Sequence, residues 1–190
     1  MSALDRALSL APWLAATLMT AAIVHLASIL LMPALAPRDA FARLETLAPR
    51  ASLTPLAPAR PGREIAPFGD PAMAVAICRY DLRDGPLRLR AELTGDDFVS
   101  FSFHARGAAI FYAMTDKAAF RGVIDVLVVT PQQLEALEAA DPEDEIPAET
   151  RLVSPTLEGF VYMRSLAALP WQAEEAAARL RKVECAAEAL

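Results

Sequence analysis

The sequence predicts an α+β fold that is mostly β: a compact antiparallel β-rich domain with a C-terminal helix, preceded by one transmembrane helix and a proline-rich stalk. Three observations predict it. Residues 7–37 contain no Asp, Glu, Lys or Arg, eight of the fifteen prolines fall between Pro33 and Pro71, and short strand-like runs follow Pro71. The predicted boundaries are a tail over 1–12, the transmembrane helix over 13–36, the stalk over 37–71 and the β-rich domain over 72–190.

The apolar segment has the length of a membrane span. Twenty residues, Trp13 to Met32, lie between two prolines, and about 20 apolar residues cross a hydrocarbon core of about 30 Å. A cleaved signal peptide is the alternative, with Ala34-Leu35-Ala36 as a small-x-small cleavage site. The run is longer than the core of a signal peptide, and cleavage would leave Pro37 first. We therefore favour an uncleaved signal anchor in the inner membrane.

The orientation of the span has arguments on both sides. Arg38, Arg43 and Arg50 follow the helix, whereas Arg6 alone precedes it, and the positive-inside rule would keep the C-terminal part in the cytoplasm. A short N-terminal tail ahead of a first hydrophobic segment favours the opposite orientation, and so do the two cysteines. We expect a periplasmic domain.

Small and polar residues form a stripe along the predicted span. Thr17, Ala21, His25 and Ser28 follow i, i+4, i+8 and i+11 and so share one helix face. Such a stripe lets transmembrane helices pack closely, and an intramembrane histidine is a functional candidate. The alternative is a neutral His25 that contacts lipid headgroups or nothing.

The proline-rich segment predicts a spacer, because proline fixes φ and removes a hydrogen-bond donor. Residues 38–48 have the pattern of a short amphipathic helix with Phe41, Leu44 and Leu47 on one side. Residues 49–71 then read as a semi-extended linker.

The remaining chain alternates as strands do. In residues 87–93, leucines and Ala91 face one way while Arg88, Arg90 and Glu92 face the other, and residues 98–104 repeat this pattern with aromatic residues opposite serines. Asp84-Gly85-Pro86 marks a turn. The predicted strands are 73–80, 87–93, 98–104, 107–114, 122–130 and 159–165, the last of these being the final strand.

Two helices are predicted in this domain. Thr130 is an N-cap residue, followed by Pro131 at the first helical position and Gln133 at the third, so a helix begins there. The second helix begins at Pro170 and runs to the C-terminus. We expect its apolar face to dock on the sheet.

The two cysteines are candidates for a disulfide. Cys78 lies in the first predicted strand and Cys185 in the last predicted helix. Outside the cytoplasm, a bond between them would close a loop of about 100 residues and stabilise the domain by up to about 4 kcal/mol. Two unrelated free thiols are the alternative.

Composition argues against several chemistries. A net charge of −6 argues against nucleic-acid binding. Two histidines and two cysteines give no zinc-ligand spacing, so no metal or other cofactor is expected. No catalytic residue is assigned: a G-x-S-x-G nucleophile motif is missing, and His104 shares one strand face with Ser100 and Ser102, where a relay is rare.

The stretch 80–114 resembles the bacterial family known as domain of unknown function 1254. Tyr80, Asp81, Leu82, Gly85 and Pro86 are similar to that family's turn, and Phe101 and Phe103 to its aromatic strand. A later segment is similar through Ser154, Pro155, Thr156 and Arg164. The resemblance covers roughly residues 72–182. It implies a β-rich domain accompanied by domain of unknown function 1214 in the same or a neighbouring protein, and it carries over no catalytic residue.

We therefore expect a non-enzymatic, single-pass envelope protein whose β-rich domain binds another envelope protein. Arg79, Arg88 and Arg90 are the first candidates for the contact face, with ordinary solvated charge as the alternative. The second hypothesis is an enzyme or small-ligand binder with a pocket between the sheet and the C-terminal helix, and with His104 or Tyr112 at its mouth.

Overall fold

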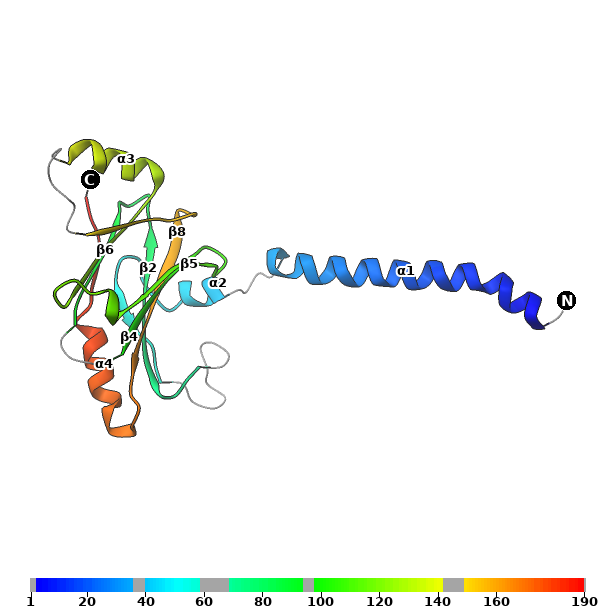
Figure 1. The fold of residues 1–190 in the computed structure, drawn as a ribbon, viewed down its shortest axis with the longest axis horizontal. Coiled ribbons are helices and arrows are strands. Elements are labelled where there is room, and N and C mark those ends of the chain that lie inside the picture. Colours follow the sequence, from blue (N-terminus) through cyan, green and yellow to red (C-terminus); the bar gives the residue numbers. More distant parts are fainter. Residues whose placement is uncertain (1–2, 36–39, 59–68, 94–97, 142–148, 190) are drawn as a thin grey trace. The chain divides into compact units, whose positions relative to one another are not determined.

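The computed structural model describes residues 3–35, 40–58, 69–93, 98–141 and 149–189. The chain divides into two units, residues 1–39 and residues 40–190. The first is a single helix, and the second is mostly β (Figure 1). The predicted α+β fold class is confirmed.

The N-terminal unit is helix α1, Ala3–Leu35, which continues through Pro12 and Pro33. Its segment Ser9–Met32 is long and apolar enough to cross a membrane. The helix begins ten residues earlier than predicted, so residues 3–12 are helical and are not a separate tail.

The β-rich unit is a sandwich of two sheets. One sheet, here called sheet A, has the strand order β1-β2-β8-β4-β5, and the other, sheet B, has the order β7-β6-β3-β9. All neighbours are antiparallel except β6 and β7. Sheet A contains β1 (Leu53–Pro55), β2 (Met73–Asp81), β4 (Val99–Ala105), β5 (Ile110–Thr115) and β8 (Glu158–Leu166); sheet B contains β3 (Leu87–Glu92), β6 (Val123–Val129), β7 (Thr150–Val153) and β9 (Glu184–Ala187).

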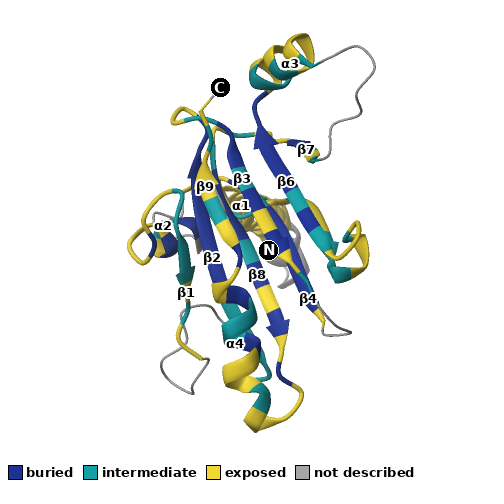
Figure 2. Cartoon of the chain, turned by 90° about the vertical axis from the view of Figure 1, so that its left-hand side faces the viewer, coloured by how far each residue is buried: buried dark blue, intermediate teal, exposed yellow. Residues whose placement is uncertain are grey.

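The core lies between the sheets, where the alternating patterns place their apolar side chains. Phe101 and Phe103 of β4 meet Leu87 and Leu89 of β3 in one buried cluster. Figure 2 shows the long central strands largely buried. At about 25 cal/mol per Å² of apolar surface removed from water, this burial is the main stabilising contribution to the unit.

Short helices complete the unit. Helix α3, Pro131–Ala140, begins as predicted, with Thr130 and Gln133 forming a capping box. A 3₁₀ turn, η1 (Asp116–Ala118), follows β5, and another, η2 (Pro170–Gln172), precedes α4 (Ala173–Arg181). Helix α4 packs on sheet A and buries Ala176 and Leu180.

The predicted C-terminal helix was wrong beyond Arg181. Helix α4 ends there, and residues 184–187 form β9, which pairs with β3. Consequently β8 is not the last strand. Pairing with the free edge of β3 outweighs the helix propensity of the alanines in this segment.

The predicted stalk was also wrong over its first half. Helix α2, Ala40–Glu45, buries Phe41 and Leu44 against Ile77 and Phe160 of sheet A. Strand β1 pairs with β2. Residues 40–56 therefore belong to the domain. Pro55 is compatible with strand β1, because a proline at the end of an edge strand costs no ladder hydrogen bond. Leu47, which was expected on the same face as Phe41, is 45% exposed. Residues 59–68 of the predicted linker lie outside the described residues.

Candidate interaction site

Several residues that carry the family resemblance, among them Tyr80, Asp81 and Ser154, lie together at one end of the sandwich, whereas Arg164 lies farther along β8, opposite Ser100. Tyr80 Oη donates to the carbonyl of His104 at 3.0 Å and lies 3.1 Å from Ser154 Oγ. Burial raises the pKa of Tyr80 to about 12, with the Ser154 contact acting in the opposite direction. The phenol therefore stays protonated and serves as a buried structural donor.

Two glycines permit this packing. A Cβ on Gly159 would lie 2.2 Å from both the His104 carbonyl oxygen and Tyr80 Oη. Gly85 has φ +123°, and a Cβ there would lie 2.3 Å from the carbonyl oxygen of Glu188. The turn after β2 is therefore fixed by close backbone approach.

Charged groups around this turn pair with one another. Asp81, buried at the end of β2, lies 2.8 Å from Arg83 and 3.2 Å from Arg50. Burial by itself would raise the pKa of Asp81, but the hydrogen bonds and positive charge of Arg83, together with Arg50, lower it below its ordinary value. Glu158 pairs with Arg83 and Arg106. Such a satisfied network stabilises a turn and offers no reactive group.

His104, which the second hypothesis placed at the mouth of a pocket, is half-buried and held by three neighbouring groups. Its ring stacks on Phe160 at 4.5 Å, Nδ1 contacts the Ala108 carbonyl at 3.0 Å, and Nε2 lies 3.0 Å from Ser102 Oγ. Burial lowers its pKa, as does the nearby charge of Arg164, while the Ala108 contact raises it. Ser102 is buried and donates to the Tyr162 carbonyl, so this serine–histidine contact lacks access for a substrate.

The three arginines predicted as one contact face do not share one face, because Arg79 lies in sheet A and the other two lie in sheet B. Arg79 is 6% exposed and lies in sheet A, where its guanidinium donates to the carbonyls of Glu45 and Ala48 and pairs with the Glu45 carboxylate. The prediction of an exposed Arg79 was wrong, because the alternation of β2 turns this residue toward α2. The buried guanidinium anchors that helix to the sheet.

Arg88 and Arg90 lie together on the outer face of sheet B, as predicted, but their charges are paired. Arg88 contacts Asp125 at 3.0 Å and Glu188 at 3.1 Å, and Arg90 lies 3.7 Å from Asp125. Hydrogen bonding with Asp125 raises the pKa of Arg88, and the charge of Glu188 adds to this. The pair therefore presents less free positive charge than the sequence predicted.

Cys78 of β2 and Cys185 of β9 are disulfide-bonded in the structure. The bond joins sheet A to sheet B, and Cys78 is fully buried. Since Cys185 lies on a strand, the bond links two strands and not a strand and a helix.

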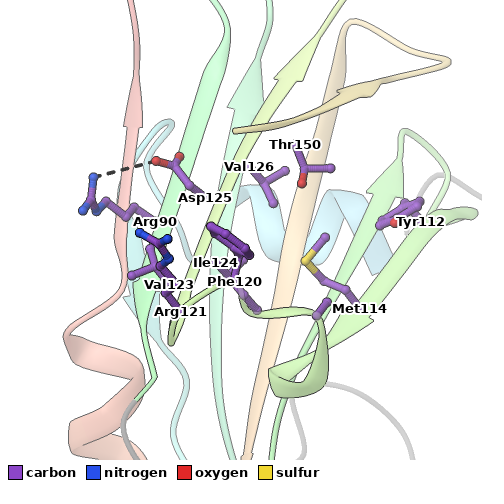
Figure 3. Close-up of a pocket in the computed structure, with 11 residues that line it drawn as sticks. Arg90, Tyr112, Met114, Phe120, Arg121, Val123, Ile124, Asp125, Val126 and Thr150 are labelled. Carbon is purple, nitrogen blue, oxygen red and sulfur yellow. Dashed lines mark ion pairs between the residues drawn. The ribbon is translucent and has the colours of Figure 1, made fainter. Parts of the chain in front are cut away.

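A cavity of about 510 Å³ opens on the other side of the sandwich, between the end strand of sheet A and sheet B. Figure 3 shows Tyr112 and Met114 of β5 on one side and Ile124 and Val126 of β6 on the other, with Thr150 above. Phe120 and Arg121 complete the rim, and the Arg90–Asp125 pair lines the cavity from the outer face of sheet B. The sequence predicted Tyr112 at the mouth of a pocket beside the C-terminal helix, whereas its cavity lies beside β6.

The rim of this cavity carries exposed apolar side chains. Tyr112 and Phe120, which both line the cavity, are 42% and 75% exposed. Aromatic residues and arginine are enriched in protein interfaces. A signal for this site was present in the sequence, since the stretch 110–115 is apolar throughout and is followed by Phe120-Arg121.

A second hollow, of about 290 Å³, lies between sheet A and α4, where the second hypothesis placed its pocket. Its lining is mostly apolar, with Glu174 and Arg181 as the charged residues, and neither His104 nor Tyr112 contributes to it. Among the described residues, no group of three or more His, Cys, Asp or Glu side chains is arranged to hold a metal ion.

The predicted stripe of the N-terminal helix does share one face. Thr17, Ala21, His25 and Ser28 line a shallow groove along α1. The hydroxyls of Thr17 and Ser28 donate hydrogen bonds to the carbonyls of Trp13 and Val24. Their polar groups are therefore satisfied within the helix.

The fold is similar to solved structures. Over 77% of this chain and 32% of the other, it matches the VPA0106 protein of Vibrio parahaemolyticus with a TM-score of 0.54 and 11% identity. An uncharacterised protein of Burkholderia cenocepacia matches over 61% of this chain and 32% of its own, with a TM-score of 0.40 and 17% identity. This chain thus spans about a third of each. No family model and no curated protein sequence matches. The first likeness shows a shared fold alone.

Proposed function

We propose that this chain is a single-pass inner-membrane protein whose periplasmic β-rich domain binds another envelope protein. The observation that carries the proposal is the apolar, uncharged strand β5 beside an open cavity, with Tyr112 and Phe120 exposed where they line it. A soluble domain gains nothing from exposing these side chains in one place, whereas an interface does.

Membrane anchoring is supported by the 24-residue apolar segment Ser9–Met32. The periplasmic side is supported by the disulfide geometry of Cys78 and Cys185, because such bonds persist in oxidising compartments. The resemblance to domain of unknown function 1254 remains part of this proposal, and with it a neighbouring protein with domain of unknown function 1214 as a candidate partner.

The side of the membrane is tested by thiol labelling. Trp171, which is 75% exposed in η2, is replaced by cysteine, and cells are treated with a membrane-impermeant maleimide. Labelling once the outer membrane alone is permeabilised places the domain in the periplasm. Labelling only after the inner membrane is broken would place it in the cytoplasm and contradict this part of the proposal.

The interaction is tested by photo-crosslinking in cells with the full chain. A photoreactive phenylalanine analogue at Phe120 is compared with the same analogue at Trp171, which is equally exposed at 75%. We expect an adduct with a second envelope protein from Phe120 and none from Trp171. Equal adduct formation at both positions, or none at either, would contradict binding at this cavity.

A further inference from the structure

Strand β5 is an exposed sheet edge, whose β-bulge at Phe103/His104 leaves Tyr112–Thr115 in regular pairing with β4. It ends sheet A and pairs with β4 on one side only, and no described residue pairs with its other side. Its sequence, IFYAMT, contains no charge and no proline. The other end strands differ: β1 has three residues and ends in Pro55, β7 contains Arg151, and β9 begins with Glu184. Proteins normally guard edges with such short length, charge or proline.

The register shows which backbone groups of β5 turn outward. Leu166 donates to the Phe98 carbonyl, so Phe98 bonds toward β8. Alternation along the ladder then turns Phe101 and Phe103 toward β5, where they face Met114 and Tyr112. The amide and carbonyl groups of Ala113 and Thr115 consequently point away from the sheet. They offer the hydrogen bonds that one further strand would take.

The cavity lies where the side chains of such a strand would project. Tyr112 and Met114 face the space between the sheets, opposite Ile124 and Val126 (Figure 3). In a strand added next to β5, every second side chain shares the face of Tyr112 and Met114. Main-chain hydrogen bonds give such complexes affinity, and pockets for alternate side chains give them specificity.

The charges at the rim favour an acidic occupant over a second copy of this chain. The charged residues that line the cavity are two arginines, Arg90 and Arg121, and one carboxylate, Asp125, which pairs with Arg90 and with Arg88. No ion pair to Arg121 is found among the described residues, and its guanidinium lies over the Phe120 ring at 5.3 Å. A second copy aligned along β5 would bring the same arginines, whereas a carboxylate on the added strand would be attracted.

We propose that β5 accepts an extended segment of the partner protein as a sixth strand of sheet A, with alternate apolar side chains in the cavity and an acidic residue beside Arg121. This proposal rests on the proposed function, since it specifies how the partner binds.

The test uses the full chain in lipid nanodiscs and a displayed library of random dodecapeptides as the probe. Ala113→Pro removes the outward amide without removing a bond to β4. Ala113→Val is the matched control, because it keeps the amide and favours strand geometry. The thermal unfolding of both variants is followed to establish that they fold.

We expect peptides with alternating apolar residues and at least one acid to be enriched. Their affinity should fall about tenfold or more for Ala113→Pro, stay unchanged for Ala113→Val, and fall about fivefold for Arg121→Glu but not for Arg121→Lys. Methylating alternate peptide amides should abolish binding in one register and leave it intact in the other.

Three results would overturn the inference. Enriched peptides that bind Ala113→Pro as well as the parent would show groove binding without strand pairing. Dimers of the chain that Ala113→Pro dissociates would show a second copy as the occupant. No enrichment over Ala113→Pro would show that the edge binds no extended segment. The Phe120 adduct decides separately whether the proposed function stands, because it requires contact and not strand pairing.

Discussion

The two edges of sheet A differ in how far other elements cover them. At the β1–β2 side, α2 and α4 cover the sheet, a disulfide joins it to sheet B, and Arg79 bonds across to α2. At the β5 side, apolar side chains remain exposed over an open cavity. The covered side therefore contributes most of the stability of the domain, whereas side chains on the open side can be substituted with little loss of stability. We therefore expect substitutions on the covered side to unfold the domain and substitutions on the open side to affect binding alone.

Removal of the disulfide should have the largest effect. Replacing both Cys78 and Cys185 by alanine opens a link with a sequence separation of 107 residues, and the chain-entropy model predicts a loss of about 5 kcal/mol. Urea unfolding of the full chain in detergent measures it. Reduction of the parent protein should give a similar loss. A loss below about 1 kcal/mol would show that the two sheets hold together without the bond.

Gly159→Ala should have the next largest effect. The new Cβ would overlap the His104 carbonyl and the Tyr80 hydroxyl, and overpacking of this kind costs about 3 kcal/mol. Gly107→Ala is the comparison, because a Cβ there meets nothing within 4 Å and only its φ of +84° is strained. If the two variants unfold at the same urea concentration, Tyr80 does not fix this end of the sandwich.

Arg79→Met should cost about 2 kcal/mol, because it leaves the carbonyls of Glu45 and Ala48 without their donor. Arg88→Met, at a half-exposed ion pair, should cost less than about 1 kcal/mol. Urea unfolding compares them, and proteolysis after Arg43 should accelerate in the first variant alone. The reverse order would mean that the hydrogen bonds of Arg79 stabilise the fold less than the ion pair of Arg88 does.

His104 should make stability depend on pH in a small and specific way. Burial holds the pKa of His104 below its ordinary value of 6.5 in the folded state, so the unfolded state binds the proton more readily. The contribution is fully present above pH 6.5 and is lost as the pH falls through the folded pKa. His104→Gln should flatten this part of the stability curve between pH 7 and pH 5. An unchanged curve would mean that other groups cause the dependence.

Phe120→Ser should have the smallest effect on stability, within about 0.5 kcal/mol, because the ring is 75% exposed. The same variant should lose the partner adduct when the photoreactive group is placed at Tyr112 instead. A large loss of stability would contradict the division of the sheet into a covered and an open side.

Local pattern predicted much of the fold. The alternation in residues 87–93 and 98–104 predicted β3 and β4 with the correct inward faces. Thr130, Pro131 and Gln133 predicted the start of α3 to the residue. These signals work because a two-residue period and a helix cap are properties of adjacent residues, which need no knowledge of what packs against them.

The misses came from contacts distant in sequence. Strands β1, β7 and β9 have three or four residues each, too few for a pattern, and they exist because a longer strand offers an unpaired edge. The sequence predicted only Tyr112 of the candidate site. Phe120, Arg121 and Ile124 lie near it because β5 pairs with β4 and β6 pairs with β3, and such pairings are not visible in the local sequence.

The sequence by itself determined the apolar span, the mostly β class of the domain, and the inward and outward faces of its long strands, because each depends on the order of neighbouring side chains. The tertiary structure alone decided that Arg79 is buried, that residues 184–187 form a strand beside Cys78, and that β5 is left without a partner. Burial and pairing are properties of what lies opposite, and in a sandwich that neighbour comes from 30 to 100 residues away, as with Arg79 and Glu45 or Arg88 and Glu188.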